Sequence, residues 1–229
     1  MDLAIMQPYF FPYLGYFQLA RSVDTFVLYD DVQFVKRSWI NRNFILSRED
    51  KERITLNVKG GSQNRLINQV GVGENKSKIL ETIRWKYSKA PYFKMAYPVV
   101  EEAIALDEPN LAMFLGYGVE RICSYLGIRP AWHWSSDLEK DPSLKGKDKI
   151  LDICQRLGAN HYINLPGGRH LYDRNEFEGQ GIKLSFIEPG NLRYEQYGER
   201  FVPNLSVIDA MMFNNPEQLA YMLSDYSLV

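Results

Sequence analysis

The polar segment YDDVQFVKRSWINRN, at positions 29–43, holds the densest group of side chains that could do chemistry. Asp30 and Asp31 could hold a metal ion, accept a proton from an amine or bind a ribose hydroxyl. Phe34 and Trp39 alternate with the charges, which favours a partly desolvated binding surface over a solvated loop with weak ion pairs. Basic and amide side chains that could clamp a diphosphate or a carboxylate follow: Gln33, Lys36, Arg37, Asn41 and Arg42.

A second candidate is the aromatic segment QPYFFPYLGYF at positions 7–17. Its two prolines fix φ and stiffen the chain. Tyrosine hydroxyls suit a base, a sugar or a phosphate, and a glycine permits close approach of a ligand or a strand. We expect the inner rings, Phe10, Phe11 and Phe17, to pack in the core. The candidates for ligand contact are Gln7, Tyr9, Tyr13, Gly15 and Tyr16.

Two further polar segments follow predicted strands. Ser135 and Ser136 begin the first, which leads to Lys145 and Lys147 before a helix. Hydroxyls and a helix amino terminus can bind phosphate, although GKDKI lacks the spacing of a Walker loop. The two lysines are equally well explained as solvated side chains.

The second of these segments is NLPGGRHLYD, at positions 164–173. Gly167 and Gly168 would let backbone amides turn toward a ligand, with Tyr172 beside them. His170 is the histidine best placed for acid or base chemistry, because the other two lie within strand patterns. No two histidines have the spacing of metal ligands, so we predict no metal site.

The elements that position these segments are read from hydrophobic spacing. A buried strand at LAIM (3–6), a helix at 14–22 and a strand at 25–30 predict a parallel βαβ unit with a right-handed crossover. The segments at 7–13 and 29–43 then follow the carboxyl ends of strands. This is the edge of an open α/β sheet where ligands bind.

The rest of the chain alternates between helical and strand patterns. A strand at 53–63 runs into a glycine turn, and helical spacing follows at 75–89, 92–106 and 109–126, with Pro91, Pro98 and Pro109 as expected breakers. We interpret the region 75–127 as a helical insertion, which could form a subdomain of a single α/β domain spanning 1–229. Strands at 131–134, 161–165 and 182–187, a helix at 147–158, a partly helical connection at 169–181 and two final helices, the first capped by Ser206, complete the fold.

Composition excludes several classes of protein. The 229 residues carry a formal charge of -1, so any anion site must be local, and we expect no binding to duplex nucleic acid. No apolar run approaches the roughly 18 residues that a membrane span needs, and the first residues lack a cleavage signature, so we predict a cytoplasmic protein. Cys123 and Cys154 lie in helical patterns, which favours core thiols over a disulfide or a zinc site.

These segments resemble the WbqC-like family of bacterial proteins. The resemblance rests on QPYFFPYLGYFQLARSVDTFVLYDDVQFVKRSWINRN, SSDL, LPGGRHLY and PNLSVIDAMMFN. It implies a place in O-antigen or other surface-polysaccharide biosynthesis, with modification of a nucleotide-linked sugar. The chain departs from the expected pattern at one loop, where Asn164 and Pro166 stand near the position of a Ser-Gly pair.

The layout is also similar to pantothenate synthetases and other nucleotidyltransferase-like proteins. That similarity implies a Rossmann-like parallel sheet, with a helical insertion and carboxyl-terminal helices in this chain. It also implies a phosphate-binding HxGH motif, whose positions are taken here by Tyr13, Gly15 and Tyr16. Neutral phenols lack the charge of an imidazolium, so ATP with magnesium, as a candidate cofactor, would depend on lysine and arginine side chains.

We therefore predict an enzyme that N-acylates the amine of a dTDP- or UDP-linked deoxyamino sugar, with an acyl or amino-acid donor. Such a reaction needs a base, for which Asp30, Asp31 and His170 are the candidates. Two alternatives remain open. One is a protein of the same pathway that binds the nucleotide sugar without turnover, and the other is a sugar-nucleotide isomerase or lyase.

Overall fold

A six-stranded sheet forms the centre of the protein. The computed structural model describes residues 1–229, and the sheet order is β10-β9-β8-β1-β2-β7. The strands are β1 (Asp2–Met6), β2 (Thr25–Leu28), β7 (Ala131–Trp134), β8 (His161–Asn164), β9 (Lys183–Pro189) and β10 (Tyr226–Leu228). All pairs are parallel except β10 with β9.

The strand order confirms the predicted Rossmann-like arrangement. β1 lies in the middle, with β2 and β7 on one side and β8 and β9 on the other. Helix α1 (Leu14–Arg21) connects β1 to β2, and Leu3 of β1 lies opposite Thr25 of β2. The predicted βαβ unit is therefore present, while the antiparallel edge strand β10 was not predicted.

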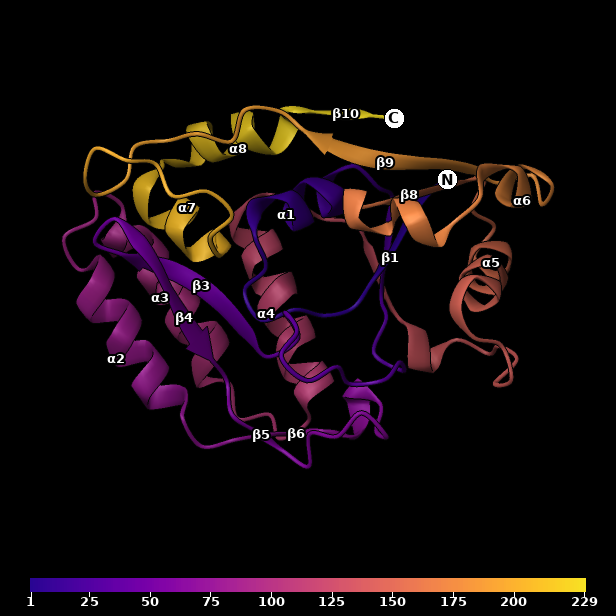
Figure 1. Ribbon diagram of the computed structural model, residues 1–229, viewed down its shortest axis with the longest axis horizontal. Coiled ribbons are helices and arrows are strands. Elements are labelled where there is room, and N and C mark those ends of the chain that lie inside the picture. Colours follow the sequence, from indigo (N-terminus) through magenta and orange to yellow (C-terminus); the bar gives the residue numbers. More distant parts are fainter.

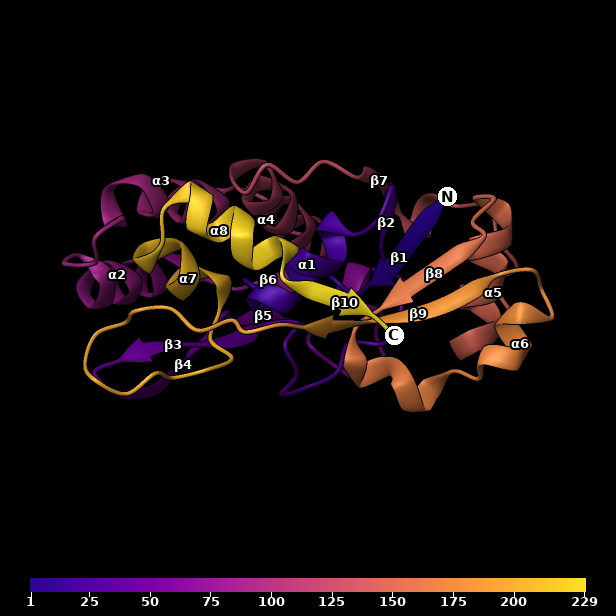
Figure 2. The ribbon, with the colours of Figure 1, turned by 90° about the horizontal axis from the view of Figure 1, so that it is seen from above.

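The two faces of the sheet are covered by different helices, because successive side chains of a strand point to opposite faces. Ala4 and Phe26 share one core with α1 and the helices that follow in the chain, whereas Leu3, Ile5 and Val27 pack with α5 (Gly146–Arg156) and α6 (Arg174–Glu178). Figure 2 shows α5 and α6 at one end of the molecule and α2, α3 and α7 at the other.

The predicted helical insertion lies between β2 and β7. It also contains two small antiparallel ribbons, and β3 pairs with β4 at the end of the molecule that carries α2 (Figure 1). The elements are β3 (Arg42–Ser47), β4 (Asp50–Thr55), β5 (Val58–Lys59), β6 (Gly71–Val72), α2 (Lys76–Tyr87), α3 (Phe93–Ala105) and α4 (Leu111–Tyr125). Two helices near the end of the chain, α7 (Val207–Phe213) and α8 (Pro216–Ser224), are also confirmed, and Ser206 caps α7 as expected.

Two expectations for the insertion were wrong. The single strand expected at 53–63 is divided between β4 and β5, and its partner β3 begins at Arg42, which we had placed in a polar loop. Pro98 does not break a helix but lies inside α3. The helix continues past the missing donor because Val99, Val100 and Ile104 are buried against the core, which outweighs one lost backbone hydrogen bond.

Side chains from distant segments hold the loop between β1 and α1. The Asn43 amide donates to the carbonyls of Phe10 (3.2 Å) and Phe11 (2.6 Å), and the Ser206 hydroxyl donates to the Phe11 carbonyl (2.8 Å). Phe11 has a φ of 45°, which a bulky residue rarely adopts without such support. Phe10, Phe11 and Phe17 are all buried, as predicted from the sequence.

Replacing Asn43 with alanine should lower the free energy of unfolding by about 2 kcal/mol. The change leaves the Phe10 carbonyl without its side-chain donor and the Phe11 carbonyl with Ser206 alone, and it removes support from the strained Phe11. Urea unfolding monitored by circular dichroism measures the effect. Asn64→Ala is the control, since Asn64 is exposed, and it should stay within about 0.5 kcal/mol of the parent. Equal stability of the two variants would contradict this role of Asn43.

Two expectations from composition concern the cysteines and the apolar length of the helices. Cys123 and Cys154 are buried free thiols, which confirms the prediction of core thiols. Burial raises the pKa of Cys154 to about 12, so this thiol stays protonated and inert. None of the helices combines the length and the apolar composition that crossing a bilayer requires.

Candidate functional site

The candidate site is a cavity of about 880 Å³ at the carboxyl ends of β2 and β7. These strands are parallel neighbours, so the loops that follow them lie side by side. The amino-terminal end of α5 forms the remaining wall of the cavity. The lining residues are Asp31, Val32, Gln33, Leu66, Ser136, Leu138, Lys140, Pro142, Leu144, Lys145, Gly146 and Lys149.

Asp31 holds two lysines at the cavity. Its carboxylate lies 2.9 Å from the Nζ of Lys140 and 2.9 Å from the Nζ of Lys149, and Lys149 also donates to the Asp31 carbonyl at 3.0 Å. Burial pushes the pKa of Asp31 upward, but hydrogen bonds from Lys140, Ser135 and Lys149 outweigh it and lower the pKa below its ordinary value. Asp31 is therefore a stable carboxylate that positions two ammonium groups.

Asp30 has a different position, although it is the adjacent residue. It is 2% exposed, and its two carboxylate oxygens accept hydrogen bonds from the Ser136 backbone (3.0 Å) and the Asn68 amide (3.2 Å). These bonds tie the loop after β2 to the loop after β7 and to the insertion. Both carboxylate oxygens already accept hydrogen bonds, so Asp30 stabilises the loops that form the site.

The amino terminus of α5 adds positive potential to the cavity. Lys145 is the N-cap residue and its side chain does not cap the helix, which leaves the first backbone N–H groups without an internal acceptor. Lys145 and Gly146 both line the cavity. Three lysines and a helix amino terminus thus face a single carboxylate, an arrangement that favours an anionic ligand.

Lys145 and Lys147 differ in position. Lys145 lines the cavity, whereas Lys147 forms an ion pair with Glu176 of α6 and does not line it. Lys145 is the N-cap residue with an extended backbone, whereas Lys147 lies within the helix, so the two side chains leave the chain in different directions.

The loop after β8 reaches the edge of the site through aromatic rings. The Nζ of Lys149 lies 4.9 Å from the centre of the Tyr29 ring, and burial, Asp31 and Tyr172 together raise the pKa of Tyr29. Tyr172 in turn packs against the rings of Tyr162 and Phe177. Tyr172 is therefore near Tyr29 but does not line the cavity.

The other predicted residues of this loop do not line the cavity. The Gly168 amide donates to the Leu165 carbonyl at 3.0 Å within a short 3-10 turn, so it is not turned toward a ligand. Gly167 and His170 are exposed. The His170 ring forms no hydrogen bond or ion pair within the chain.

In the first loop, the aromatic residues mostly support one another. The Tyr16 hydroxyl is fully buried and donates to the Gln7 carbonyl at 3.1 Å. A Cβ at position 15 would lie 2.4 Å from the Tyr13 ring, so Gly15 makes room for that ring and not for a ligand or a strand. Tyr9 packs on Tyr16, and burial raises the pKa of Tyr13 to about 12. None of these residues lines the cavity.

The basic residues after β2 are also outside the cavity. Lys36 and Arg37 are exposed, and Arg42 belongs to β3. The Asn41 amide donates to the Leu56 carbonyl at 2.8 Å, which joins the insertion to this loop. Of the polar segment 29–43, Asp31, Val32 and Gln33 line the cavity.

Two lysines that line the cavity, Lys140 and Lys149, were not predicted from the sequence. Lys140 lies in an irregular loop without a recognisable pattern. Lys149 carried a signal, because it is four residues before Ile153 and adjacent to Ile150, both core residues of α5. A lysine on the buried face of an amphipathic helix needs a partner, and that partner is Asp31.

The donors around the cavity do not fit a magnesium ion. No three His, Cys, Asp or Glu side chains are grouped so that they could hold a metal. Asp31 is engaged by two lysines and Asp30 by two N–H donors. The phosphates of a nucleotide suit the lysines, but the carboxylate ligands that magnesium requires are occupied.

The fold and the site define an α/β protein with a lysine-lined cavity at the carboxyl edge of a Rossmann-like sheet. The chain belongs to the WbqC-like protein family, which it matches over residues 7–221. It is 30% identical over 230 residues to an uncharacterized protein of Mycobacterium tuberculosis, covering 96% of this chain and 97% of the relative. No solved structure is significantly similar to it.

Proposed function

We propose that this protein binds a nucleotide-linked sugar in the 880 Å³ cavity, with the diphosphate on Lys140, Lys145 and Lys149. The observation that carries the proposal is the pair of lysines held 2.9 Å from Asp31, because it fixes two cations at a cavity of ligand size. The free amides of α5 would add donors to the same phosphates.

The reaction that we propose is acyl transfer to the amine of a deoxyamino sugar during surface-polysaccharide biosynthesis in the cytoplasm. The amine attacks the acyl carbonyl, a carbon–nitrogen bond forms, the bond to the leaving group breaks and a base takes the amine proton. Of the predicted bases we propose His170, because Asp30 and Asp31 are both engaged in the structure. His170 is exposed and does not line the cavity, so this role requires the sugar amine to lie outside the cavity, at the loop after β8. A carboxylate with a lowered pKa, such as Asp31, is also a weak base.

A second candidate is a protein that binds the same nucleotide sugar without turnover. It is favoured by the position of Asp30 and Asp31, since neither carboxylate is free to accept a proton at the cavity. His170 would then have no chemical role.

A thermal-shift panel of dTDP-, UDP- and GDP-sugars, with and without ATP and magnesium, tests the binding proposal. A ligand at about 100 times its dissociation constant should stabilise the protein by about 2.7 kcal/mol. Lys145→Gln should weaken binding of the responding sugar nucleotide about tenfold, because a cation that contacts phosphate is lost. Lys147→Gln is the matched control, two residues along the same helix but outside the cavity, and should bind normally. Absence of any shift would refute the site.

Mass spectrometry separates the enzyme from the binding protein. The chain is incubated with the dTDP- or UDP-amino sugar and, in separate reactions, an acyl thioester or an amino acid with ATP. A product heavier by one acyl or aminoacyl group supports acyl transfer. An unchanged sugar that still binds supports the second candidate, and a change in its NMR spectrum without a change in mass would indicate an isomerase.

A further inference from the structure

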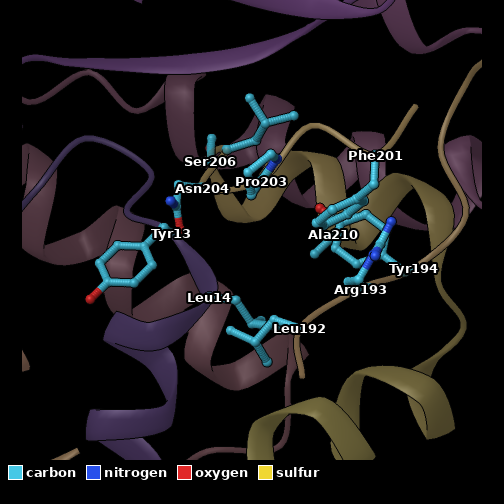
Figure 3. A pocket seen from close by; sticks show the side chains of 11 residues that line it. Tyr13, Leu14, Leu192, Arg193, Tyr194, Phe201, Pro203, Asn204, Ser206 and Ala210 are labelled. Carbon is cyan, nitrogen blue, oxygen red and sulfur yellow. The ribbon is translucent and has the colours of Figure 1, made fainter. Parts of the chain in front are cut away.

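A second cavity, smaller and mainly apolar, lies between the start of α1, the segment after β9 and α7. Its volume is about 220 Å³, and it is separate from the lysine-lined cavity because the two share no lining residue. Figure 3 shows Leu14 and Leu192 on one side, Pro203 and Asn204 opposite them, and Phe201 with Arg193 on a third side. Leu205 and Ala210 complete the apolar lining.

The size of the cavity limits its occupant. An apolar protein cavity of about 150 Å³ accepts one benzene ring, so 220 Å³ suits a group of roughly six to eight carbon atoms. The hydroxyl of Tyr13 points away from the other labelled side chains, which leaves the interior largely apolar. A sugar or a phosphate would lose its hydrogen bonds there.

The charged residue at the cavity determines which polar end group the occupant can have. Arg193 lines the cavity, and its guanidinium carbon lies 5.5 Å from the centre of the Phe201 ring, yet it forms no ion pair with any carboxylate of the chain. A guanidinium is matched to a carboxylate. No Asp or Glu lines the cavity, so an ammonium group would have no counter-charge.

The wall that carries Arg193 is fixed in place. The adjacent Tyr194 donates to the buried Asp209 at 2.8 Å, and the Gln196 amide donates to Asp209 at 2.6 Å. The Val202 backbone amide donates to the side-chain oxygen of Gln196 at 2.8 Å, which links the two ends of the segment 196–202. On the opposite side, the Val207 amide donates to the Pro12 carbonyl at 2.9 Å. The cavity is therefore preformed, as ligand sites usually are.

We propose that this second cavity binds a short aliphatic carboxylic acid of about six to eight carbons, with its alkyl chain in the apolar interior and its carboxylate on Arg193. The absence of an acidic lining residue argues against a free amino acid as occupant. Its use as the acyl-donor site rests on the function proposed above, but binding of the acid itself does not.

The test is a methyl-resolved NMR titration of the full chain with hexanoate, 1-hexanol and hexylamine. Hexanoate should give saturable shifts at the methyl groups of Leu14, Leu192 and Leu205, and should bind at least fivefold more tightly than hexanol. Arg193→Gln should reduce the affinity for hexanoate to that for hexanol. Arg200→Gln, which removes the same charge from the same segment outside this cavity, should leave the preference intact.

The outcomes separate this inference from the proposed function. Shifts elsewhere in the chain, no saturable shift with hexanoate, or equal effects of Arg193→Gln and Arg200→Gln would overturn it. Leu192→Trp, which fills the cavity from a partly exposed position, should abolish binding of both hexanoate and hexanol. Lys145→Gln should bind hexanoate normally, so a failure at one cavity leaves the result at the other unaffected.

Discussion

Replacing Asp31 with asparagine should lower the free energy of unfolding by about 2–3 kcal/mol, because it leaves two ammonium groups side by side without a counter-charge. The side chains of Lys140 and Lys149 are only 7% and 11% exposed. Removing one partner of a fully buried ion pair costs about 3–5 kcal/mol, and the open cavity beside this cluster reduces that value. The same change releases both lysines, so affinity for sugar nucleotides should also fall.

Urea unfolding at pH 7 measures this loss of stability. Asp152→Asn, which breaks the surface pair of Asp152 with Arg156 on α5, is the control and should cost less than about 0.5 kcal/mol. Because the folded pKa of Asp31 lies below 3.8, its contribution is complete above about pH 4 and is lost as the pH falls further. The double variant Asp31→Asn with Lys140→Met should regain part of the stability. If Asp31→Asn were as stable as Asp152→Asn, Asp31 would not organise the lysines.

The central sheet could be predicted because its signals are local. LAIM and TFVL are apolar runs short enough for buried strands, and the helix between them has apolar residues on one face. The β3–β4 hairpin gave a weaker signal, because only the end of β4, from Arg53, fell within a predicted strand. Its burial alternates weakly, and Lys51, Glu52 and Arg53 dominate the second strand, so the pattern of a half-buried strand is hidden.

The sequence predicted the edge of the sheet at which the site lies, but not the set of residues that form it. Asp31 follows β2, and the rule that ligands bind at the carboxyl ends of parallel strands placed it at the correct edge. Its partners come from 109 and 118 residues later in the chain, and no local pattern connects them with Asp31. The loop at 7–17 was ambiguous for the same reason. Asn43 and Ser206, which hold it, belong to β3 and to the cap of α7.

Asp209 is the clearest case of a residue whose role depends on distant partners. From the sequence it is an acid three residues after the N-cap Ser206, in the position of a capping-box residue. In the structure it is fully buried and accepts hydrogen bonds from Tyr87 of α2 and from Tyr194 and Gln196 of the segment after β9. It therefore joins the insertion to the wall of the second cavity, and no other carboxylate contacts this cluster.

Stability should rise as the pH falls from about 6 to 4, and Asp209→Asn should remove this rise. Burial raises the pKa of Asp209 to about 6, against 3.8 for an ordinary aspartate, and the three donors only partly offset the burial. Above pH 6 the folded state holds a buried charge, whereas below about pH 4 the group is neutral in both states. A difference of about two between folded and unfolded pKa corresponds to roughly 3 kcal/mol.

Subtracting the unfolding free energies of wild type and Asp209→Asn from pH 4 to 7 isolates this group, since other acids titrate in both proteins. A constant difference across that range would show that Asp209 has the same pKa folded and unfolded, and that the carboxylate is fully stabilised by its three donors.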